Sequence, residues 1–173
     1  MTRWLSPTEE AAWRAYIEGS LRLNARIDDD LQASQGMTMF EYHVLLLLSE
    51  APEGRLRMRE LADRMVFSPS RLTYQVARMA REGVISRQPC DDDRRGSYAI
   101  ITPKGRRTLG RAALAHVTSV REHLLHLLDS ADIQDLGRIF TRVRSHLEPP
   151  GDGPPPGGRP SGAGAAPRRP RGK

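Results

Sequence analysis

The middle of the chain contains two short helical patterns followed directly by two β-rich segments, and this succession leaves few folds open. The first helical pattern places Leu61 and Met65 on one face. Ser68 and Pro69 then supply an N-cap and a first-turn proline for a second helix, which we expect to end at Gly83. Two short helices joined by a tight turn form a helix-turn-helix unit.

The two β-rich segments are predicted to form a hairpin. Their sequences are VISR at 84–87 and YAII at 98–101, and a charged, glycine-containing tip at 91–96 lies between them. β-Branched and aromatic residues favour strands, and glycine favours a turn. A hairpin that directly follows a helix-turn-helix is a wing, so we expect a mainly α fold with a small β-hairpin wing.

Helical patterns also flank this central region. Ser6 with Glu9, and Thr38 with Glu41, match the spacing of a capping box, and Thr102-Pro103 and Ser130 are expected to begin two further helices. The apolar stripes on the outer helices need a partner surface, which a second copy in a two-fold dimer would supply. We therefore expect one domain at 1–148, with a helical dimerisation region at 7–33 and 103–148 and a winged helix-turn-helix region at 38–102.

Positive charge is concentrated in the middle of the chain and in its last residues. Residues 55–107 carry 13 basic and 6 acidic side chains, whereas residues 1–54 carry 4 and 9. A basic block favours a polyanionic partner, because each phosphate contact releases condensed counterions. Residues 149–173 are mostly Pro, Gly, Ala and Arg, which offer no apolar surface to bury, so we expect a disordered tail there.

The second helix of the pair has two chemically different sides. On a helical wheel Leu72, Val76 and Met79 share one face, and basic and hydrogen-bonding residues gather opposite them. Such side chains contact base edges in the major groove and backbone phosphates. A merely solvated helix face is the alternative, although no acidic residue precedes Glu82 in this helix. The candidate DNA contacts on this side are Ser70, Arg71, Tyr74, Gln75, Arg78 and Arg81.

The tip of the predicted hairpin adds a second candidate contact. Arg94 and Arg95 protrude where a wing meets the minor groove, whose narrow A·T-rich stretches attract arginine. Asp93 can orient one of these guanidinium groups. We expect no metal at Asp91 to Asp93, because a hairpin of this size supplies too few ligands.

Other protein classes have little support in the sequence. Cys90 is the single cysteine, which excludes an intramolecular disulfide and hence a secreted disulfide scaffold. No apolar run approaches the length of about 18 residues that a membrane span needs, and the N-terminus does not look like a signal peptide, so we expect the cytoplasm. There is no nucleophile elbow, phosphate-cradling glycine loop or zinc-protease helix, so we expect neither catalysis nor a cofactor.

Taken together, these segments resemble the multiple antibiotic resistance regulator (MarR) family. The matching stretches are MRELA at 58–62, SPSRLT at 68–73, EGVISR at 82–87, DRRG at 93–96 and ITPKG at 101–105. The resemblance implies a dimer of winged-helix subunits on a pseudo-palindromic operator in double-stranded DNA. It usually implies a repressor that a small phenolic or other aromatic effector, or an oxidant, releases from DNA.

The resemblance also assigns roles to individual residues. It places Ser68, Ser70, Thr73, Tyr74 and Arg78 at major-groove contacts, and Asp93 and Arg95 in an Asp-x-Arg wing motif. It places an effector between the long helices and the winged domain. The candidate ligand contacts there are Trp13, Tyr16, Phe40, Tyr42 and His43. For each of them, a role in the core or in an interface is the alternative.

Two other sensing routes and one other function stay open. Cys90 lies beside the wing, whereas oxidant-responsive relatives place their reactive cysteine near the first helix. His116, His123 and His126 share a stripe of the third long helix and could meet a metal across a dimer, although solvated or interfacial histidines are the simpler interpretation. The alternative function is a winged-helix nucleoid protein or a protein-interaction module without ligand response.

Overall fold

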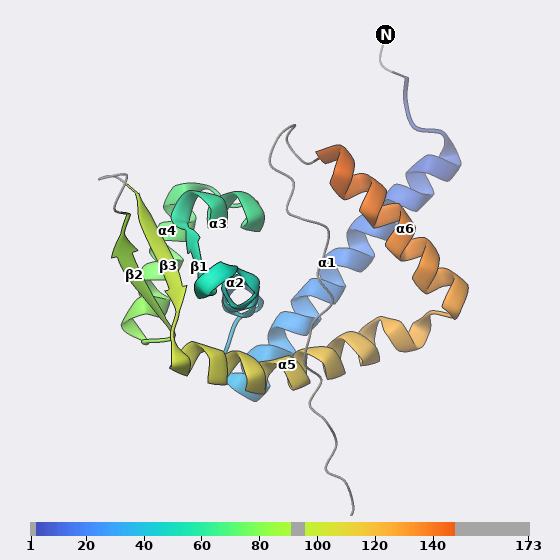
Figure 1. Ribbon diagram of the computed structural model, residues 1–173. Helices are drawn as coiled ribbons and strands as arrows, with labels where there is room; N and C mark the ends of the chain where they lie inside the picture. Colours follow the sequence, from blue (N-terminus) through green and yellow to red (C-terminus); the bar gives the residue numbers. More distant parts are fainter. Residues whose placement is uncertain (1–2, 91–95, 148–173) are drawn as a thin grey trace, which may run out of the picture. The chain divides into compact units, whose positions relative to one another are not determined.

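A computed structural model of the chain describes residues 3–90 and 96–147 (Figure 1). It contains α1 (Pro7–Gln35), α2 (Met39–Glu50), the 3-10 turn η1 (Pro52–Gly54), β1 (Arg55–Arg57), α3 (Met58–Met65), α4 (Pro69–Arg81), β2 (Ile85–Pro89), β3 (Ser97–Ile101), α5 (Pro103–His123), the 3-10 turn η2 (Leu125–Leu127) and α6 (Ser130–Leu147). The chain divides into two compact units, of which the first ends at Asp129 and the second begins at Ser130.

Reciprocal caps fix the beginnings of α1 and α2. The backbone N–H of Ser6 donates to Glu9 Oε2 at 2.7 Å, and the Glu9 N–H donates to Ser6 Oγ at 3.3 Å. Thr38 and Glu41 repeat this arrangement with distances of 2.8 and 3.2 Å. Both predicted capping boxes are confirmed. Because such caps satisfy N–H groups that have no partner within the helix, they define where each helix starts.

The sheet has three antiparallel strands in the order β1-β3-β2. The hairpin predicted from the sequence is present as β2 and β3, with Arg87 opposite Ala99. β1 was not predicted; it pairs Leu56 with Ala99 along the other edge of β3. Its three residues are too few to show the alternation that identifies a strand. Leu56 and Ala99 are both buried, which ties the sheet to the core.

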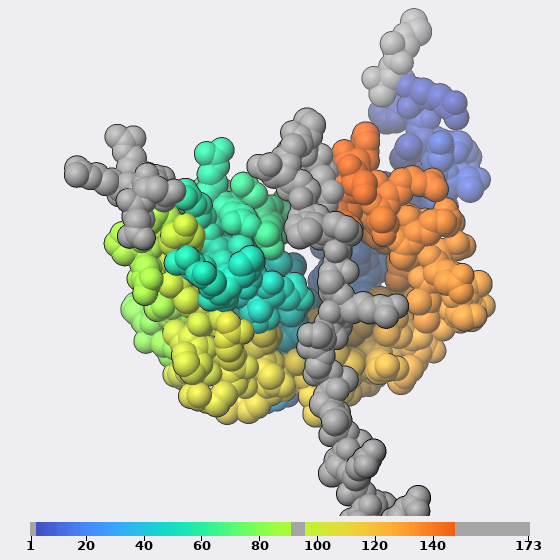
Figure 2. Space-filling model, in the orientation of Figure 1, coloured from blue at the N-terminus to red at the C-terminus, as the bar shows by residue number. Residues whose placement is uncertain are grey.

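The core lies where α2, α3, α4 and the sheet meet. Leu45 and Leu48 of α2, Leu61 of α3, and Leu72 and Val76 of α4 are all fully excluded from solvent. α4 packs against α3 and β2, and α2 packs against α3, α5 and β3. In the space-filling view the atoms of α2, α3, the sheet and the start of α5 form one continuous body (Figure 2).

α5 connects this body to α1. Its N-cap Thr102 accepts a hydrogen bond from the Gly105 N–H at 3.0 Å and donates to the carbonyl of Gly83 at 2.8 Å. The helix ends at His123, because the backbone at Leu124 (φ −134°, ψ −63°) leaves the helical region and η2 follows. α5 packs against α1, and Figure 1 shows that it does so at the C-terminal part of α1, where Ile27 and Leu31 are buried.

α6 forms the regular part of the second unit. It begins at Ser130, where the sequence predicted a helix start, and several of its apolar side chains are exposed. Within the described residues, no helix combines the length and the apolar character that crossing a membrane requires.

The first turn of α5 generates a prediction. A Cβ atom on Gly105 would lie 2.0 Å from the carbonyl oxygen of Val84, whereas one on Gly110 would meet nothing within 4 Å. We expect Gly105→Ala to destabilise the fold by at least about 1–3 kcal/mol, because backbone must move to relieve the overlap. Gly110→Ala, in the same helix, should be neutral or stabilising by up to about 1 kcal/mol. Urea unfolding of both variants measures this, and equal stabilities would contradict it.

Candidate nucleic-acid interface

α4 presents opposite chemistry on its two sides. Leu72, Val76 and Met79 have no solvent exposure, whereas Tyr74 is 70% exposed. The predicted wheel is thereby confirmed for the apolar face. Of the predicted contacts, the exposed ones are Ser68, Ser70, Arg71, Thr73, Tyr74 and Arg81, and the half-buried ones are Gln75 and Arg78. Asp93, Arg94 and Arg95 lie outside the described residues.

The N-terminal end of α4 carries a group of exposed hydroxyls. Ser68 is the N-cap residue by its backbone, but its side chain makes no capping hydrogen bond and instead lies 3.4 Å from Ser70 Oγ. The predicted side-chain cap is therefore wrong, while the predicted boundary is right. Thr73 Oγ1 donates to the Pro69 carbonyl at 2.7 Å, which leaves its lone pairs to accept. Hydroxyl groups that serve as donors and acceptors suit a surface that must adapt to base edges.

Arg71 is held by an aromatic ring at the turn between α3 and α4. Its guanidinium carbon lies 4.7 Å from the centroid of Phe67, and Phe67 packs edge-on against Phe40 of α2 at 5.2 Å. A cation over an aromatic face gains electrostatic attraction and loses side-chain freedom. Arg71 is therefore directed before any ligand binds.

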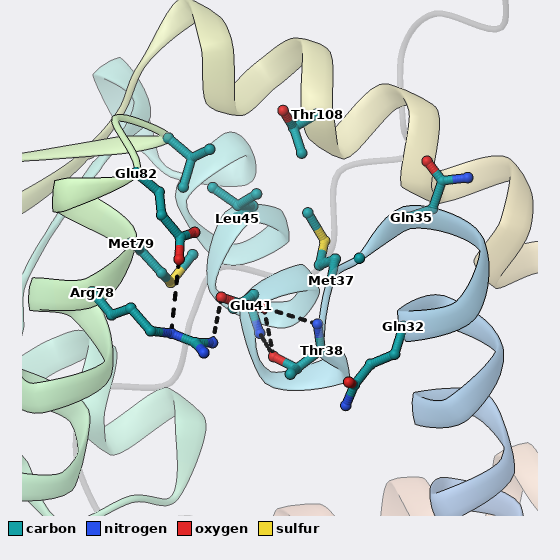
Figure 3. A pocket seen from close by; sticks show the side chains of 12 residues that line it. Gln32, Gln35, Met37, Thr38, Glu41, Leu45, Arg78, Met79, Glu82 and Thr108 are labelled. Carbon is teal, nitrogen blue, oxygen red and sulfur yellow. Dashed lines mark hydrogen bonds and ion pairs between the residues drawn. The ribbon is translucent and has the colours of Figure 1, made fainter.

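Arg78 is less free than its position on the wheel suggested. Its Nη2 donates to Glu41 Oε1 of α2 at 2.5 Å, and its Nε lies 4.0 Å from Glu82 Oε1 (Figure 3). The Glu41 side chain is 9% exposed and the Arg78 side chain 41%. The other carboxylate oxygen of Glu41 accepts the N–H and hydroxyl of Thr38. One carboxylate therefore caps α2 and joins α2 to the last turns of α4.

A cavity of about 260 Å³ lies beside this ion pair. Besides Glu41 and Arg78, it is lined by residues from the end of α1, from the start of α2, from the end of α4 and from α5. Gln32, Thr38 and Thr108 contribute polar groups, and Met37 and Leu45 contribute apolar ones (Figure 3).

Comparison with known proteins decides the family. AbsC, a MarR family transcriptional regulator from Streptomyces coelicolor, is 39% identical to this chain, with a TM-score of 0.77 over 84% of this chain and 98% of its own. The chain belongs to the MarR family of transcriptional regulators. The sequence model of the MarR family matches residues 35–96, which hold α2, the helix-turn-helix and β2.

Two further relatives agree with the MarR assignment. Sco3205 from Streptomyces coelicolor, a MarR family regulator solved in complex with DNA, is 38% identical, with a TM-score of 0.81 over 87% of this chain and 94% of its own. The HTH-type transcriptional repressor YetL from Bacillus subtilis is 25% identical over 114 residues, which are 64% of this chain and 68% of YetL. The predicted fold, a mainly α winged helix-turn-helix with a small sheet, is that of the MarR structures.

The aromatic residues predicted to bind an effector in this MarR-family chain occupy separate places. Trp13 and Tyr16 pack on each other in α1 with ring centroids 5.7 Å apart. Phe40 packs on Phe67, and the buried Tyr42 stacks on His116 of α5 at 4.4 Å. None of them, nor the exposed His43, lines the cavity beside Arg78.

The histidines of α5 serve different neighbours. Asp30 of α1 accepts hydrogen bonds from Ser119 Oγ at 2.7 Å and from His123 at 2.9 Å. The hydrogen bond from Ser119 lowers the pKa of the Asp30 carboxyl, and His123 and Arg26 add to this effect. His126 lies beyond the end of α5 in η2. No group of three metal-ligating side chains occurs in the part of the chain that the structure describes.

His116 has one buried atom without a partner. Its Nδ1 makes no hydrogen bond, and burial lowers the pKa of the imidazole below its ordinary value, with the nearby His43 acting in the same direction. Cys90 is also buried, at 5% exposure. Because a reactive thiol needs access to solvent, this position does not favour oxidant sensing.

The second role of Glu41 was not predicted from the sequence. The residue was expected only as part of a capping box, which is correct, but its contact with Arg78 joins positions 37 residues apart. The only sequence signal was a charged residue at the start of a mostly apolar helix. Such a signal indicates that a charge is buried, but it does not predict which residue pairs with it.

The ion pair generates a prediction for stability. We expect Arg78→Ala to lower the free energy of unfolding by about 1–2 kcal/mol, because it leaves a buried carboxylate without its charged partner while Arg78 itself is partly solvated. Arg81→Ala, which removes an exposed arginine from the same helix, should change it by less than about 0.5 kcal/mol. Urea unfolding of these variants and of Glu41→Gln combined with Arg78→Ala measures the coupling. A loss of stability in Arg78→Ala no larger than that in Arg81→Ala would show that the pair contributes nothing.

Proposed function

We propose that this MarR-family regulator recognises a specific double-stranded DNA sequence through α4. The observation that carries the proposal is the division of α4 into a fully buried apolar side and an exposed side of hydroxyl, aromatic and basic groups. An α-helix fits the major groove, where arginine, serine and glutamine side chains distinguish base pairs. The 38% identical Sco3205, which was solved in complex with DNA, supports this use of the fold.

Each proposed contact follows from its place on α4. Ser68, Ser70 and Thr73 lie at its exposed N-terminal end, the part of a recognition helix that meets base edges. Tyr74 and Gln75 follow, and Arg81 lies near the end, where a long cationic side chain suits a phosphate. Arg78 would contact DNA with the part of its guanidinium that Glu41 leaves uncovered. For the wing, the proposed contacts are Asp93, Arg94 and Arg95.

The regulator is proposed to act as a homodimer. α1, α5 and α6 carry exposed apolar side chains that include Leu21, Leu114 and Val143. A second copy would cover such surfaces, and a two-fold dimer would present two copies of α4 to successive turns of the duplex, about 34 Å apart. A pseudo-palindromic operator would match this symmetry.

Repression with release by an aromatic effector is the proposed regulatory mode. The Bacillus subtilis relative is named as a repressor, which supports the sign of regulation. The unpartnered Nδ1 of His116 beside the Tyr42 ring supports a phenolic ligand, because a phenol would stack there and hydrogen-bond to this atom. Titration of phenol and salicylate into a complex with DNA tests this, and unchanged DNA affinity would argue against it.

The alternative is a nucleoid or protein-interaction module, and selection from a random duplex pool separates the two. We expect the purified chain to enrich one sequence with inverted symmetry. Tyr74→Ala should weaken binding to that sequence by about 1–3 kcal/mol and should leave binding to a mixed-sequence duplex nearly unchanged. Tyr74→Phe shows whether the hydroxyl or the ring matters. Enrichment of no sequence, with tight binding to every duplex, would favour the nucleoid protein.

Sedimentation equilibrium tests the dimer. We expect Val143→Glu, which places a charge on an apolar side chain of α6 that is 43% exposed, to shift the protein toward monomer and to weaken DNA binding. Gln134→Glu adds the same charge at a polar, exposed position of α6 and should leave the dimer intact. Circular dichroism verifies that both variants keep their helices. A Val143→Glu variant that remains fully dimeric would place the interface elsewhere.

A further inference from the structure

A second cleft lies between the start of α3, the exposed side of α4 and the two strands of the hairpin. Its volume is about 400 Å³. It is lined by Arg57, Met58, Arg59, Thr73, Arg87, Gly96 and Ser97. These residues come from several different elements, and among them are three arginines and no acidic residue.

Two of the arginines of this cleft contact neighbours on β3. Arg87 of β2 donates from Nη2 to Ser97 Oγ of β3 at 3.0 Å, which holds its guanidinium across the hairpin. Arg57 lies with its guanidinium carbon 5.7 Å from the centroid of the Tyr98 ring, its partner residue in the sheet. Arg59 is exposed on the first turn of α3. The hydroxyl of Ser97 therefore directs the Arg87 guanidinium without neutralising it, and the ring of Tyr98 lies close to the Arg57 guanidinium.

The carboxylates described near this cleft are engaged elsewhere or are not part of its lining. Glu60 of α3 pairs with Arg64 at 2.7 Å. Glu53 pairs with Arg55 at 2.6 Å. Within residues 3–90 and 96–147, neither Arg59 nor Arg87 forms an ion pair with a carboxylate. Like charges that line one cleft repel each other, so their arrangement is stabilised when an anion enters.

We propose that this cleft binds one backbone phosphate of the DNA duplex, with Arg59 and Arg87 as its principal ligands and Arg57 at its edge. The proposal rests on the proposed reading of DNA by α4, because Thr73 belongs both to the exposed side of α4 and to the cleft wall. A phosphate held there would fix how far α4 enters the groove. Phosphate contacts position a protein on DNA without reading its sequence.

This assignment differs from the predicted contacts of α4 in its measurable consequences. A base-reading side chain contributes to one sequence, whereas a phosphate ligand contributes to every duplex and to the salt dependence of binding. Arg59→Ala and Arg87→Ala should each weaken binding about tenfold, to the same extent on a mixed-sequence duplex and on a sequence selected by the protein. The plot of log affinity against log salt should become shallower by about 0.9 for each phosphate that the variant no longer neutralises.

Matched variants separate a local effect from a general reduction of positive charge. Arg121→Ala removes an exposed arginine from the last turn of α5 and should leave the salt slope unchanged. Arg59→Lys and Arg87→Lys keep a cation that can bind phosphate and should recover most of the affinity. Thermal unfolding of Arg59→Ala and Arg87→Ala should be unchanged or shifted upward, because a repulsion is removed. An equal decrease of affinity in Arg121→Ala would overturn the proposal.

Duplexes in which a single phosphate is replaced by a neutral methylphosphonate locate the contact. At one position per half-site the wild-type protein should lose about as much affinity as the Arg59→Ala, Arg87→Ala double variant, and the double variant should lose nothing further there. Additive losses at every position would overturn the proposal. A second result would also overturn it: inorganic phosphate raises the melting temperature of the wild type but not of the double variant, while the two proteins bind DNA with equal affinity. The cleft would then bind a free anion and not the DNA backbone. Failure to bind any duplex would instead remove the proposed function.

Discussion

Leu72, Val76 and Met79 are completely excluded from solvent, and their burial sets the rotation of α4 about its own axis. Three large side chains spaced along one stripe stabilise a single orientation, because a turn of the helix by one residue would expose them and bury polar groups. The outward direction of Ser70, Tyr74 and Arg81 is a consequence of this packing. The proposed recognition surface is therefore specified by the residues on the opposite, buried side of the helix.

The arginines around α4 fall into groups with different partners. Arg78 faces the buried carboxylate of Glu41, so its charge is already largely compensated inside the protein. Arg71 lies over an aromatic ring, which directs it without neutralising it. Arg59 and Arg87 line a cleft whose described walls contain no acidic residue. Net charge alone does not distinguish these side chains. Their surroundings do, because among these four only Arg59 and Arg87 line a cleft that is suited to an anion.

Local signals in the sequence predicted the local structure well, and long-range contacts account for what was missed. Ser6 with Glu9, and Thr38 with Glu41, cap their helices within four residues, so their spacing alone was sufficient. The apolar stripe of α4 followed from helical periodicity. β1 was missed because its pairing partner, β3, lies more than 40 residues away. The Glu41–Arg78 pair, 37 residues apart, and the Tyr42–His116 contact are also long-range, and His116 was expected to be solvated or interfacial, or to meet a metal across a dimer.

α5 links the end of α4 to α1, so its position couples these two helices. At its first turn, Thr102 and Lys104 bond to the carbonyls of Gly83 and Glu82, which directly follow α4. Near its other end, Ser119 and His123 bond to Asp30 of α1. A helix of this length is a stiff rod of roughly 30 Å. Because both of its ends are fixed by hydrogen bonds, a shift of α5 along α1 must either break the Asp30 contacts or displace the end of α4. The first turn of α5 lies so close to the backbone at Val84, where Gly105 approaches it, that a shift of this turn displaces the residues that follow α4.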